Sequence, residues 1–191
     1  MPRVSVREKI VDAAVVEFHR GGYNGCSVET ITKAAGVPKG SFYNHFRSKE
    51  DLGAAAVARY TEQSQWEGVD PGLPVLDQLR DRFTAQRELI EANGFTRGCL
   101  IGNMGEEAAD HSLPIRAQVQ ASLAGWAAEI AVFIRAAQET GEVPAGLDAE
   151  QAGRFILDAW EGSILRVKAE KSAAGFDSFF AHVFGILLAL S

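Results

Sequence analysis

The 191-residue chain has few of the residues that disulfide-rich or metal-binding proteins require. It contains only two cysteines and four histidines. Cys26 and Cys99 are far apart in the sequence, so we expect two free thiols rather than a disulfide. The histidines are too scattered to combine with the cysteines in the spacing of a zinc site, so we expect no metal and no cofactor; they are His19, His45, His111 and His182.

Long hydrophobic runs are also missing. The most apolar stretch, residues 176–190, is interrupted by Asp177 and His182 and is too short to span a bilayer. The first residues, MPRVSVREK, are charged and lack the apolar core of a signal peptide. We therefore expect a cytoplasmic protein with no membrane partner.

Signatures of catalysis are absent as well. The sequence has no Ser/His/Asp arrangement, no zinc-ligand spacing and no phosphate-binding glycine loop, so we expect that it is not an enzyme. One class that stays open is a helical small-molecule-binding protein or an enzyme without DNA binding, which is the alternative to the DNA-binding function considered below. A DNA-packaging protein is disfavoured, since such proteins gain affinity from broad positive charge and this chain has an isoelectric point near 5.3.

The charge is divided unevenly along the chain. Residues 1–49 carry eight Lys and Arg against four Asp and Glu, whereas the rest carries 11 against 21, and the net charge is −6. The chain thus has a basic head, residues 1–49, and an acidic body, the remaining residues. This division is typical of a protein whose head binds phosphate groups.

Strand-type alternation is almost absent, and apolar residues recur at spacings of three and four, which predicts an all-α protein. Gly21-Gly22 should end the first helix, and Ser27 and Ser48 should cap later ones. The stretch EGVDPGLP, residues 67–74, breaks the pattern and suggests a boundary. We predict a DNA-binding domain over 1–50, a connecting helix over 51–66 and a helical domain over 75–191. The expected helices span 5–20, 28–35, 38–45, 48–66, 75–93, 113–139, 148–170 and 176–190.

Residues 28–47 have the pattern of a helix-turn-helix, in which Gly36 forms a tight turn and the following helix enters the DNA major groove. Phe42 and Phe46 are four residues apart and should anchor that helix in the core. The polar residues of the same stretch offer donors to bases or phosphates, and Gly40 allows close backbone approach. The alternative is a short amphipathic helix that binds no DNA.

The run TITKAAGVPKGSFYNHFRSKEDL, residues 30–52, resembles the signature of the TetR family of bacterial repressors, and F-x-x-x-G-Y at 18–23 matches the end of that family's first helix. The resemblance implies a homodimeric repressor that leaves its operator DNA when an effector binds the C-terminal body. Carried over by position, the DNA contacts would be Ser27, Thr30, Lys39, Gly40, Ser41, Tyr43, Asn44, His45 and Lys49. Glu29 departs from the family's usual non-acidic residue, and we leave it out of this set.

The family pairs its subunits through the last two long helices, which are 148–170 and 176–190 here. Small residues on the first helix would permit close approach, and aromatic residues on the second would fill the seam. The expected interface comprises Gly153, Ala159, Gly162, Phe179, Phe180, Val183 and Phe184. The alternative is that both helices close the core of their own subunit.

No cationic cluster marks the body, which favours an apolar or neutral aromatic effector. The expected pocket comprises Phe83, Cys99, Met104, Trp126, Ile130, Phe133, Phe155 and Trp160, although such residues are more often plain core than ligand contacts. The segment RGCLIGNMGEEAAD, 97–110, also resembles the subgroup of the family that responds to N-ethylmaleimide and related electrophiles through a cysteine here.

A thiol at a helix N-terminus near Arg97 would have a lowered pKa and raised reactivity, and the glycines of this segment would make it a hinge. Modification of Cys99 is therefore a second candidate trigger, and the alternative is that Cys99 is a small buried hydrophobic residue.

Overall fold

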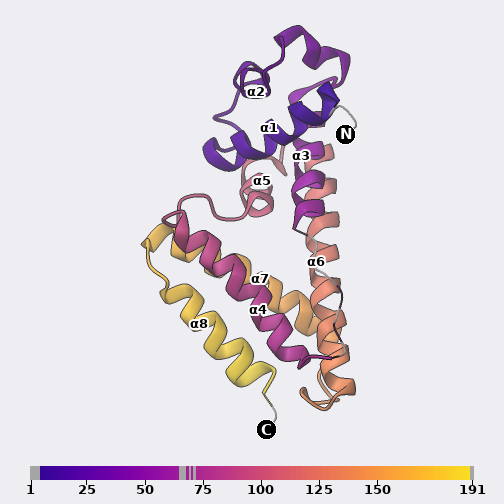
Figure 1. Cartoon of the computed structure of the whole chain (residues 1–191), viewed down its shortest axis with the longest axis vertical. Coiled ribbons are helices and arrows are strands. Elements are labelled where there is room, and N and C mark those ends of the chain that lie inside the picture. The colour runs from indigo at the N-terminus through magenta and orange to yellow at the C-terminus, as the bar shows by residue number, and fades with distance from the viewer. Residues whose placement is uncertain (1–4, 65–67, 69, 71, 190–191) are drawn as a thin grey trace. The chain divides into compact units, whose positions relative to one another are not determined.

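The structure, a computed structural model, describes residues 5–64, 68, 70 and 72–189. These residues contain helices and turns and no strand, which confirms the all-α prediction (Figure 1). The elements in chain order are α1 (Val6–Gly21), α2 (Val28–Ala34), η1 (Lys39–Asn44), α3 (Lys49–Gln63), α4 (Val75–Ala92), α5 (Leu100–Ala108), α6 (Leu113–Glu139), α7 (Ala149–Glu170), α8 (Ala174–His182) and η2 (Val183–Leu187).

Serine side chains cap the N-termini of α1, α2 and α3. The hydroxyl of Ser27 accepts a hydrogen bond from the backbone N–H of Thr30 at 3.0 Å, and that of Ser48 accepts from Asp51 at 3.2 Å. Each hydroxyl satisfies a backbone donor that the helix itself leaves unpaired. Gly22 follows α1 with φ +76°, a conformation that glycine adopts without steric cost. The predicted caps and the predicted end of the first helix are thus confirmed.

Three segments differ from the sequence-based expectation. Lys39–Asn44 is a 3₁₀ helix rather than an α-helix, which suits its six residues because 3₁₀ geometry occurs in short pieces. The glycine-rich stretch expected as a hinge contains the helix Leu100–Ala108, whose Leu100, Ile101, Met104 and Ala108 are buried. The last helix ends in a π-helical turn at Val183–Leu187. Trp66 and Leu190, the predicted ends of two helices, lie outside the described residues.

The chain falls into two compact units. The first comprises residues up to 65 together with Cys99–Ser122, and the second comprises residues 66–98 together with 123–191. Compactness therefore groups 99–122 with the N-terminal helices, whereas the sequence-based division assigns them to the C-terminal domain. Packing, rather than order along the chain, produces this grouping, and the division into functional domains stays a prediction.

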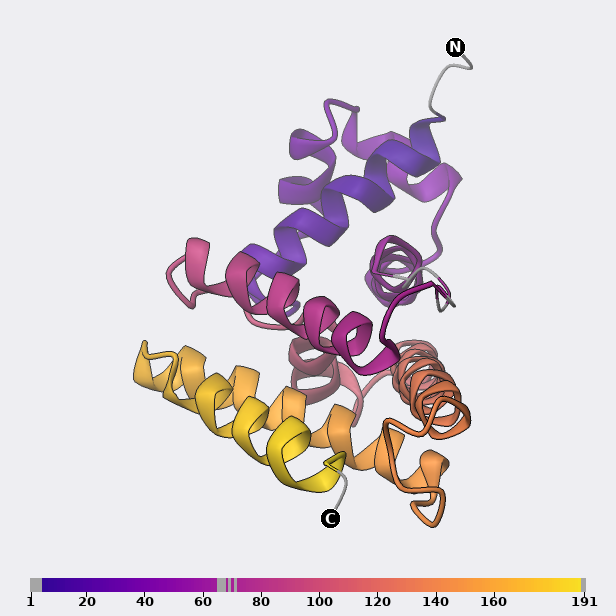
Figure 2. The same cartoon turned by 60° about the horizontal axis from the view of Figure 1, so that its bottom comes forward.

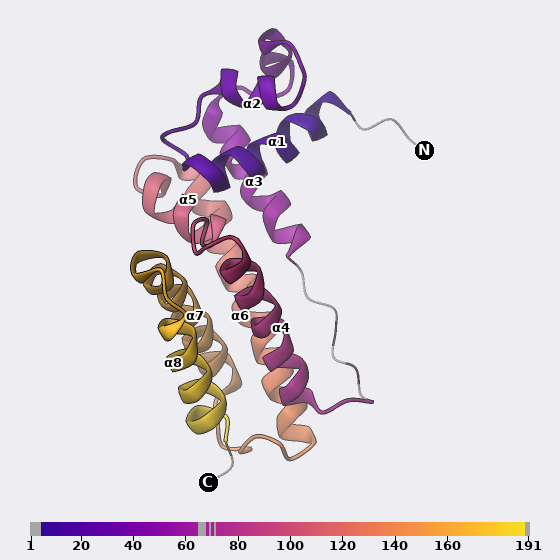
Figure 3. The same ribbon diagram turned by 60° about the vertical axis from the view of Figure 1, so that its left-hand side comes forward.

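The core of the first unit is built where α1 packs against α2 and α3, and where α5 packs against α1 and α3 (Figure 3). Side chains spaced three or four residues apart on α1 supply one wall, and Phe18 lies 5.3 Å from Tyr23 between ring centroids. The largest fully buried side chains of α1, α2, η1 and α3 are Ile10, Phe18, Ile31, Phe42 and Leu52.

The core of the second unit is aromatic and joins α4, α7 and α8, which run side by side (Figure 2). The Phe83 ring lies 5.0 Å from both the Trp160 and the Phe179 ring centroids, and Trp160 stacks on Phe176 at 4.9 Å. The Trp160 indole N–H also donates to the side-chain oxygen of Gln86 at 3.0 Å. Buried aromatic groups at these separations contribute both apolar area and favourable ring geometry.

Within the described residues, α6 is the one helix whose length and composition would allow it to cross a membrane. Several of its apolar side chains are instead buried in the protein, including Ile130, Phe133 and Ile134. Packing in the core therefore accounts for part of the apolar character of α6, whose Leu113 and Val132 are exposed.

Candidate nucleic-acid interface

The turn before η1 fixes how this short helix is presented. Gly36 has φ +66°, and the backbone N–H of Val37 donates to the carbonyl of Thr32 at 3.0 Å, which closes the turn after α2. Pro38 is extended and immediately precedes η1. Phe42 and Phe46 are buried, and their rings stack at 5.5 Å. These two rings anchor one side of η1, as the sequence predicted, and leave its other side to solvent.

The outward side of η1 carries most of the predicted DNA contacts. Tyr43 is 65% exposed, although its ring edge touches Phe42, and a Cβ on Gly40 would meet nothing within 4 Å. The remaining polar side chains of this segment lie on the same short element: Lys39, Asn44 and His45 are exposed, and Ser41 is half-buried. The structure therefore leaves most of these predicted residues accessible on η1 and at its C-terminal end.

The start of α2 adds two hydroxyl groups. Ser27 and Thr30 are exposed, and their side-chain oxygens lie 2.9 Å apart. Because the Ser27 hydroxyl also accepts from the Thr30 backbone, it has a structural role as the helix cap. Both hydroxyls nevertheless remain accessible to a further hydrogen-bond partner.

Glu29 was left out of the predicted site, yet it contacts the helix that should read DNA. Its Oε2 lies 3.1 Å from the Lys39 ammonium, in an ion pair that joins the first turn of α2 to the first residue of η1. The carboxylate is 72% exposed and the lysine side chain 55% exposed. The acidic character of position 29 was visible in the sequence, but its pairing with a residue ten positions later was not.

Lys49 was predicted to bind a phosphate, but its side chain contacts Tyr23 within the first unit. Its ammonium donates to the Tyr23 carbonyl at 2.7 Å and lies 4.2 Å from the centroid of the Tyr23 ring. Burial lowers the pKa of Lys49, against the opposing influence of Cys26 and Glu107. The first position of α3 directs this side chain to the loop after α1, so we remove Lys49 from the proposed contact set.

Much of the positive charge of the head is already paired with acids. Arg47 forms two hydrogen bonds with Asp51, at 2.8 and 3.2 Å, and Arg20 lies 2.5 Å from Glu17. The Arg47 side chain is 91% exposed all the same, which leaves it accessible to other partners. The positive balance of residues 1–49 therefore overstates how much free cationic charge the first unit offers.

The loop between α1 and α2 is held by a carboxylate of α5. Glu107 Oε2 accepts from the backbone N–H of Asn24 at 2.8 Å, and the Asn24 amide donates to the Glu107 carbonyl at 3.4 Å. A Cβ at Gly22 would lie 2.6 Å from Glu107 Oε1, so a larger residue would displace this carboxylate, and the φ of +76° also favours glycine here. These contacts join α5 to the segment that immediately precedes the helix-turn-helix.

The residues predicted for a dimer seam divide between the interior and the surface. Gly153 is buried against α6 of the same chain, where a Cβ would lie 2.6 Å from the carbonyl oxygen of Ala127. Phe179, Val183 and Phe184 are also buried within the chain. The helices that carry these four residues therefore pack them in the core of their own subunit, which supports the alternative interpretation for all four. Gly162 is exposed, whereas Ala159 and Phe180 are half-buried.

The predicted effector residues also separate. Cys99 and Met104 belong to the first unit, whereas Trp126, Ile130 and Phe133 belong to the second. Phe83 and Trp160 contact each other in the aromatic core of the second unit. The Arg82 guanidinium lies 4.8 Å from the Phe133 ring, so this region contains a cation that the sequence-based prediction did not consider.

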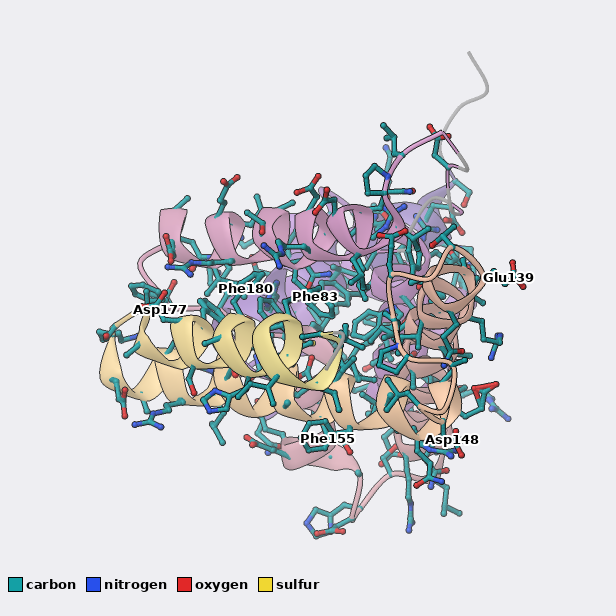
Figure 4. The ribbon with its side chains drawn as sticks, turned by 90° about the horizontal axis from the view of Figure 1, so that it is seen from below. Phe83, Glu139, Asp148, Phe155, Asp177 and Phe180 are labelled. Carbon is teal, nitrogen blue, oxygen red and sulfur yellow. The ribbon has the colours of Figure 1, made fainter. Side chains whose placement is uncertain are left out.

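Phe155 is a clear exception to the predicted pocket. It is 59% exposed on the side of α7 turned away from α4, whereas Phe83 and Phe180 lie between α4 and α8 (Figure 4). The helical period places Ala152, Ile156 and Trp160 inward and Phe155 outward. We therefore remove Phe155 from the pocket.

Within the described residues neither cysteine forms a disulfide, and both are buried, with exposed fractions of 4% for Cys26 and 6% for Cys99. Burial raises the pKa of the Cys26 thiol, and nearby Glu17 raises it further. Cys99 occupies the N-cap position of α5. Low exposure restrains the reactivity of either thiol in this conformation.

An exposed short helix anchored by two phenylalanines after a glycine turn has the geometry of a helix-turn-helix. The chain belongs to the TetR family of bacterial regulators. Residues 10–56 match the family model described as bacterial regulatory proteins, tetR family, and residues 75–183 match the tetracyclin repressor-like C-terminal domain.

Relatives match along nearly the whole chain. The HTH-type transcriptional repressor DhaR of Mycobacterium sp. (strain GP1) is 34% identical over 194 residues, which cover 98% of this chain and 95% of DhaR. The transcriptional regulator AcuR of Cereibacter sphaeroides is 35% identical, with 90% of this chain and 80% of AcuR covered. The repressor NemR of Escherichia coli (strain K12) is 28% identical, with 87% and 85% covered.

Solved structures agree with this assignment. A regulatory protein TetR from Rhodobacter sphaeroides has a TM-score of 0.80 and 34% identity, with 93% of this chain and 96% of that chain covered. The reduced form of E. coli NemR has a TM-score of 0.75 and 25% identity, with 95% and 97% covered. The chain is therefore a TetR-family transcriptional regulator, of a family whose members bind operator DNA, form homodimers and bind small-molecule effectors.

Proposed function

We propose that this protein is a cytoplasmic repressor, and not an enzyme, that reads its operator through the exposed surface of η1 and the start of α2. One observation carries the proposal: Phe42 and Phe46 are buried while Tyr43, Asn44 and His45 beside them face solvent. The proposed contact residues are Ser27, Thr30, Lys39, Gly40, Ser41, Tyr43, Asn44 and His45.

Within this set the residues have different roles. Ser27 and Thr30 would donate to phosphate oxygens, which positions the protein without reading sequence. Lys39 and the polar side chains of η1 would reach base edges in the major groove. Gly40 would let the η1 backbone approach the DNA, because its position is open in the free protein.

The proposed subunit interface uses the outward faces of α7 and η2 rather than their buried aromatic residues. Three large apolar side chains there are exposed: Phe155, Leu165 and Ile186, at 59%, 57% and 68%. Gly162 lies between the first two on the same face of α7 and leaves room for a second helix. Two heads on one dimer would read half-sites about 34–36 Å apart.

The proposed effector site lies in the second unit, with Phe83, Trp126, Ile130, Phe133 and Trp160 as candidate lining. The ring faces favour an apolar or aromatic ligand. Binding would favour a conformation that does not fit the operator, and so release DNA by population shift.

Modification of Cys99 is the second candidate trigger. The observation that favours it is its position at the start of α5, the helix whose Glu107 holds the loop before α2. A covalent change at Cys99 would reach the DNA-binding surface through that helix. Met104 belongs to the same helix and would be part of this second site.

The test is fluorescence anisotropy on labelled DNA from upstream of the protein's own gene, at fixed salt, with an unrelated duplex as competitor. We expect the protein to bind this DNA selectively, with the highest affinity for a fragment that contains a palindrome. Adding N-ethylmaleimide to the wild type and to Cys99→Ser separates the triggers, because only a Cys99 trigger makes release depend on that residue. Equal affinity for operator and unrelated DNA would contradict the proposal.

A further inference from the structure

Resting on the proposed DNA contacts, we infer that Glu29 is a specificity-determining residue that holds Lys39 away from non-specific phosphate. The two side chains join α2 to η1 through a 3.1 Å contact between Oε2 and the ammonium. Glu29 touches no base in this account. It is a positioning residue that acts through Lys39.

The contact uses the ammonium that opens the proposed reading element. Lys39 is the first residue of η1, and Gly40 after it has no side chain and open space around it. The carboxylate of Glu29 lies in the first turn of α2, between Ser27 and Thr30, the two residues proposed to meet phosphates. A carboxylate in this position takes the place that a DNA phosphate oxygen would take beside Lys39.

The consequence differs between the two kinds of DNA. On unrelated DNA, Lys39 could bind a phosphate only by giving up the Glu29 carboxylate, which would replace one ion pair by another and bring two anions close together, so Lys39 stays paired with Glu29. On the operator, Lys39 gains hydrogen bonds to base acceptors in the major groove, such as the O6 and N7 atoms of guanine. Glu29 therefore weakens non-specific binding more than operator binding.

An exposed ion pair contributes little to stability, so the effect of Glu29 is expected in DNA binding rather than in folding. Non-specific affinity comes from phosphates neutralised by Lys and Arg, with a slope of log affinity against log salt of about −0.9 for each phosphate. Freeing Lys39 in both subunits should add two such contacts. The slope on unrelated DNA should then steepen by about 1.8.

The experiment compares wild type with Glu29→Gln on the operator fragment and on an unrelated duplex across a salt series. We expect Glu29→Gln to bind the unrelated duplex at least about fivefold more tightly at 0.1 M salt, with the steeper slope. The ratio of non-specific to operator dissociation constants should fall at least about threefold. Glu62→Gln is the matched control, since it removes the same charge from an exposed acid of α3 that pairs with Arg59 instead.

Repeating Glu29→Gln in a Lys39→Gln background tests whether the effect runs through Lys39, and we expect most of it to disappear. If Glu29→Gln has the same effect in the Lys39→Gln background, the inference is overturned. It is also overturned if Glu29→Gln weakens operator binding selectively, because Glu29 would then be a base contact. Wild-type protein that binds both duplexes equally would overturn the proposed function as well. If the wild type is selective and Glu29→Gln leaves its ratio of non-specific to operator dissociation constants unchanged, the role of Glu29 alone is overturned.

Discussion

Glu107 on α5 accepts a hydrogen bond from the backbone N–H of Asn24, with 2.8 Å between Oε2 and nitrogen. The two residues are 83 positions apart, and the contact links the glycine-rich segment after α4 to the loop before the helix-turn-helix. A change in α5 would therefore alter the support of the DNA-binding surface.

Replacing Glu107 with Ala should destabilise this loop and weaken operator binding. The loss of a hydrogen bond from a backbone donor costs about 1 kcal/mol, which should appear as a lower melting temperature. Glu106→Ala is the control, because Glu106 is an exposed neighbour on the same helix. Equal melting temperatures and operator affinities for the two variants would contradict a supporting role for Glu107.

The region around Gly22 and Glu107 contains both features that the sequence predicts and features that it does not. Helical periodicity, the serine caps and Gly22 could be predicted because they depend on local spacing and backbone conformation. The approach of Glu107 to Gly22 and the inward turn of Lys49 could not, since both depend on contacts between segments far apart in the chain. The helix at Leu100–Ala108 was missed because burial of its apolar face outweighs the low helix propensity of Gly102 and Gly105.

The site was likewise predictable in part. The spacing of Phe42 and Phe46 fixes which side of η1 faces solvent, so most of the exposed polar residues were identified. For α7 and α8, the apolar pattern shows that a face is buried without showing whether its own chain or a partner covers it. Gly153 and Phe179 illustrate this, because the structure buries both within their own chain.

Phe83 should be a principal contributor to the stability of the second unit. It is 1% exposed and contacts three aromatic rings, so Phe83→Ala should lower the free energy of unfolding by about 3–5 kcal/mol. Leu89→Ala on the same helix removes a side chain that is 69% exposed and should change it little. Urea unfolding measures both, and similar losses would contradict the assigned core.

The exposed apolar face of α7 should govern dimerisation. Leu165→Glu places a charge in the proposed interface, and we expect the dimer dissociation constant to rise at least about tenfold because the charge would be desolvated there. Analytical ultracentrifugation measures the change. Leu89→Glu is the control on α4, and a dimer that tolerates Leu165→Glu as well as Leu89→Glu would place the interface elsewhere.

Glu142 should make stability depend on pH. Its carboxylate accepts from the backbone N–H groups of Val75 and Leu76 at 3.0 Å each, and from the Thr140 hydroxyl at 2.7 Å. Burial alone would raise the pKa of Glu142, but these hydrogen bonds outweigh burial and lower it.

Because the folded-state pKa is below the unfolded value, the stabilisation is present above the unfolded pKa and is lost as pH falls through the folded pKa. We expect Glu142→Ala to lower the melting temperature at pH 7, with a difference from wild type that shrinks in acid. Glu139→Ala, at the exposed end of α6 (Figure 4), is the matched control for removing a carboxylate. A difference that does not shrink as the pH falls would contradict this role.

The central claim is that the exposed surface of η1 reads the operator, and the most direct measurement is the operator affinity of Tyr43→Ala. Tyr43 is 65% exposed and lies outside the core, so circular dichroism and the melting temperature should match wild type. We predict that operator affinity falls at least about tenfold while affinity for unrelated DNA changes much less, as loss of a base-reading contact of about 1.4 kcal/mol requires. A folded Tyr43→Ala protein that binds the operator as tightly as wild type would contradict the account.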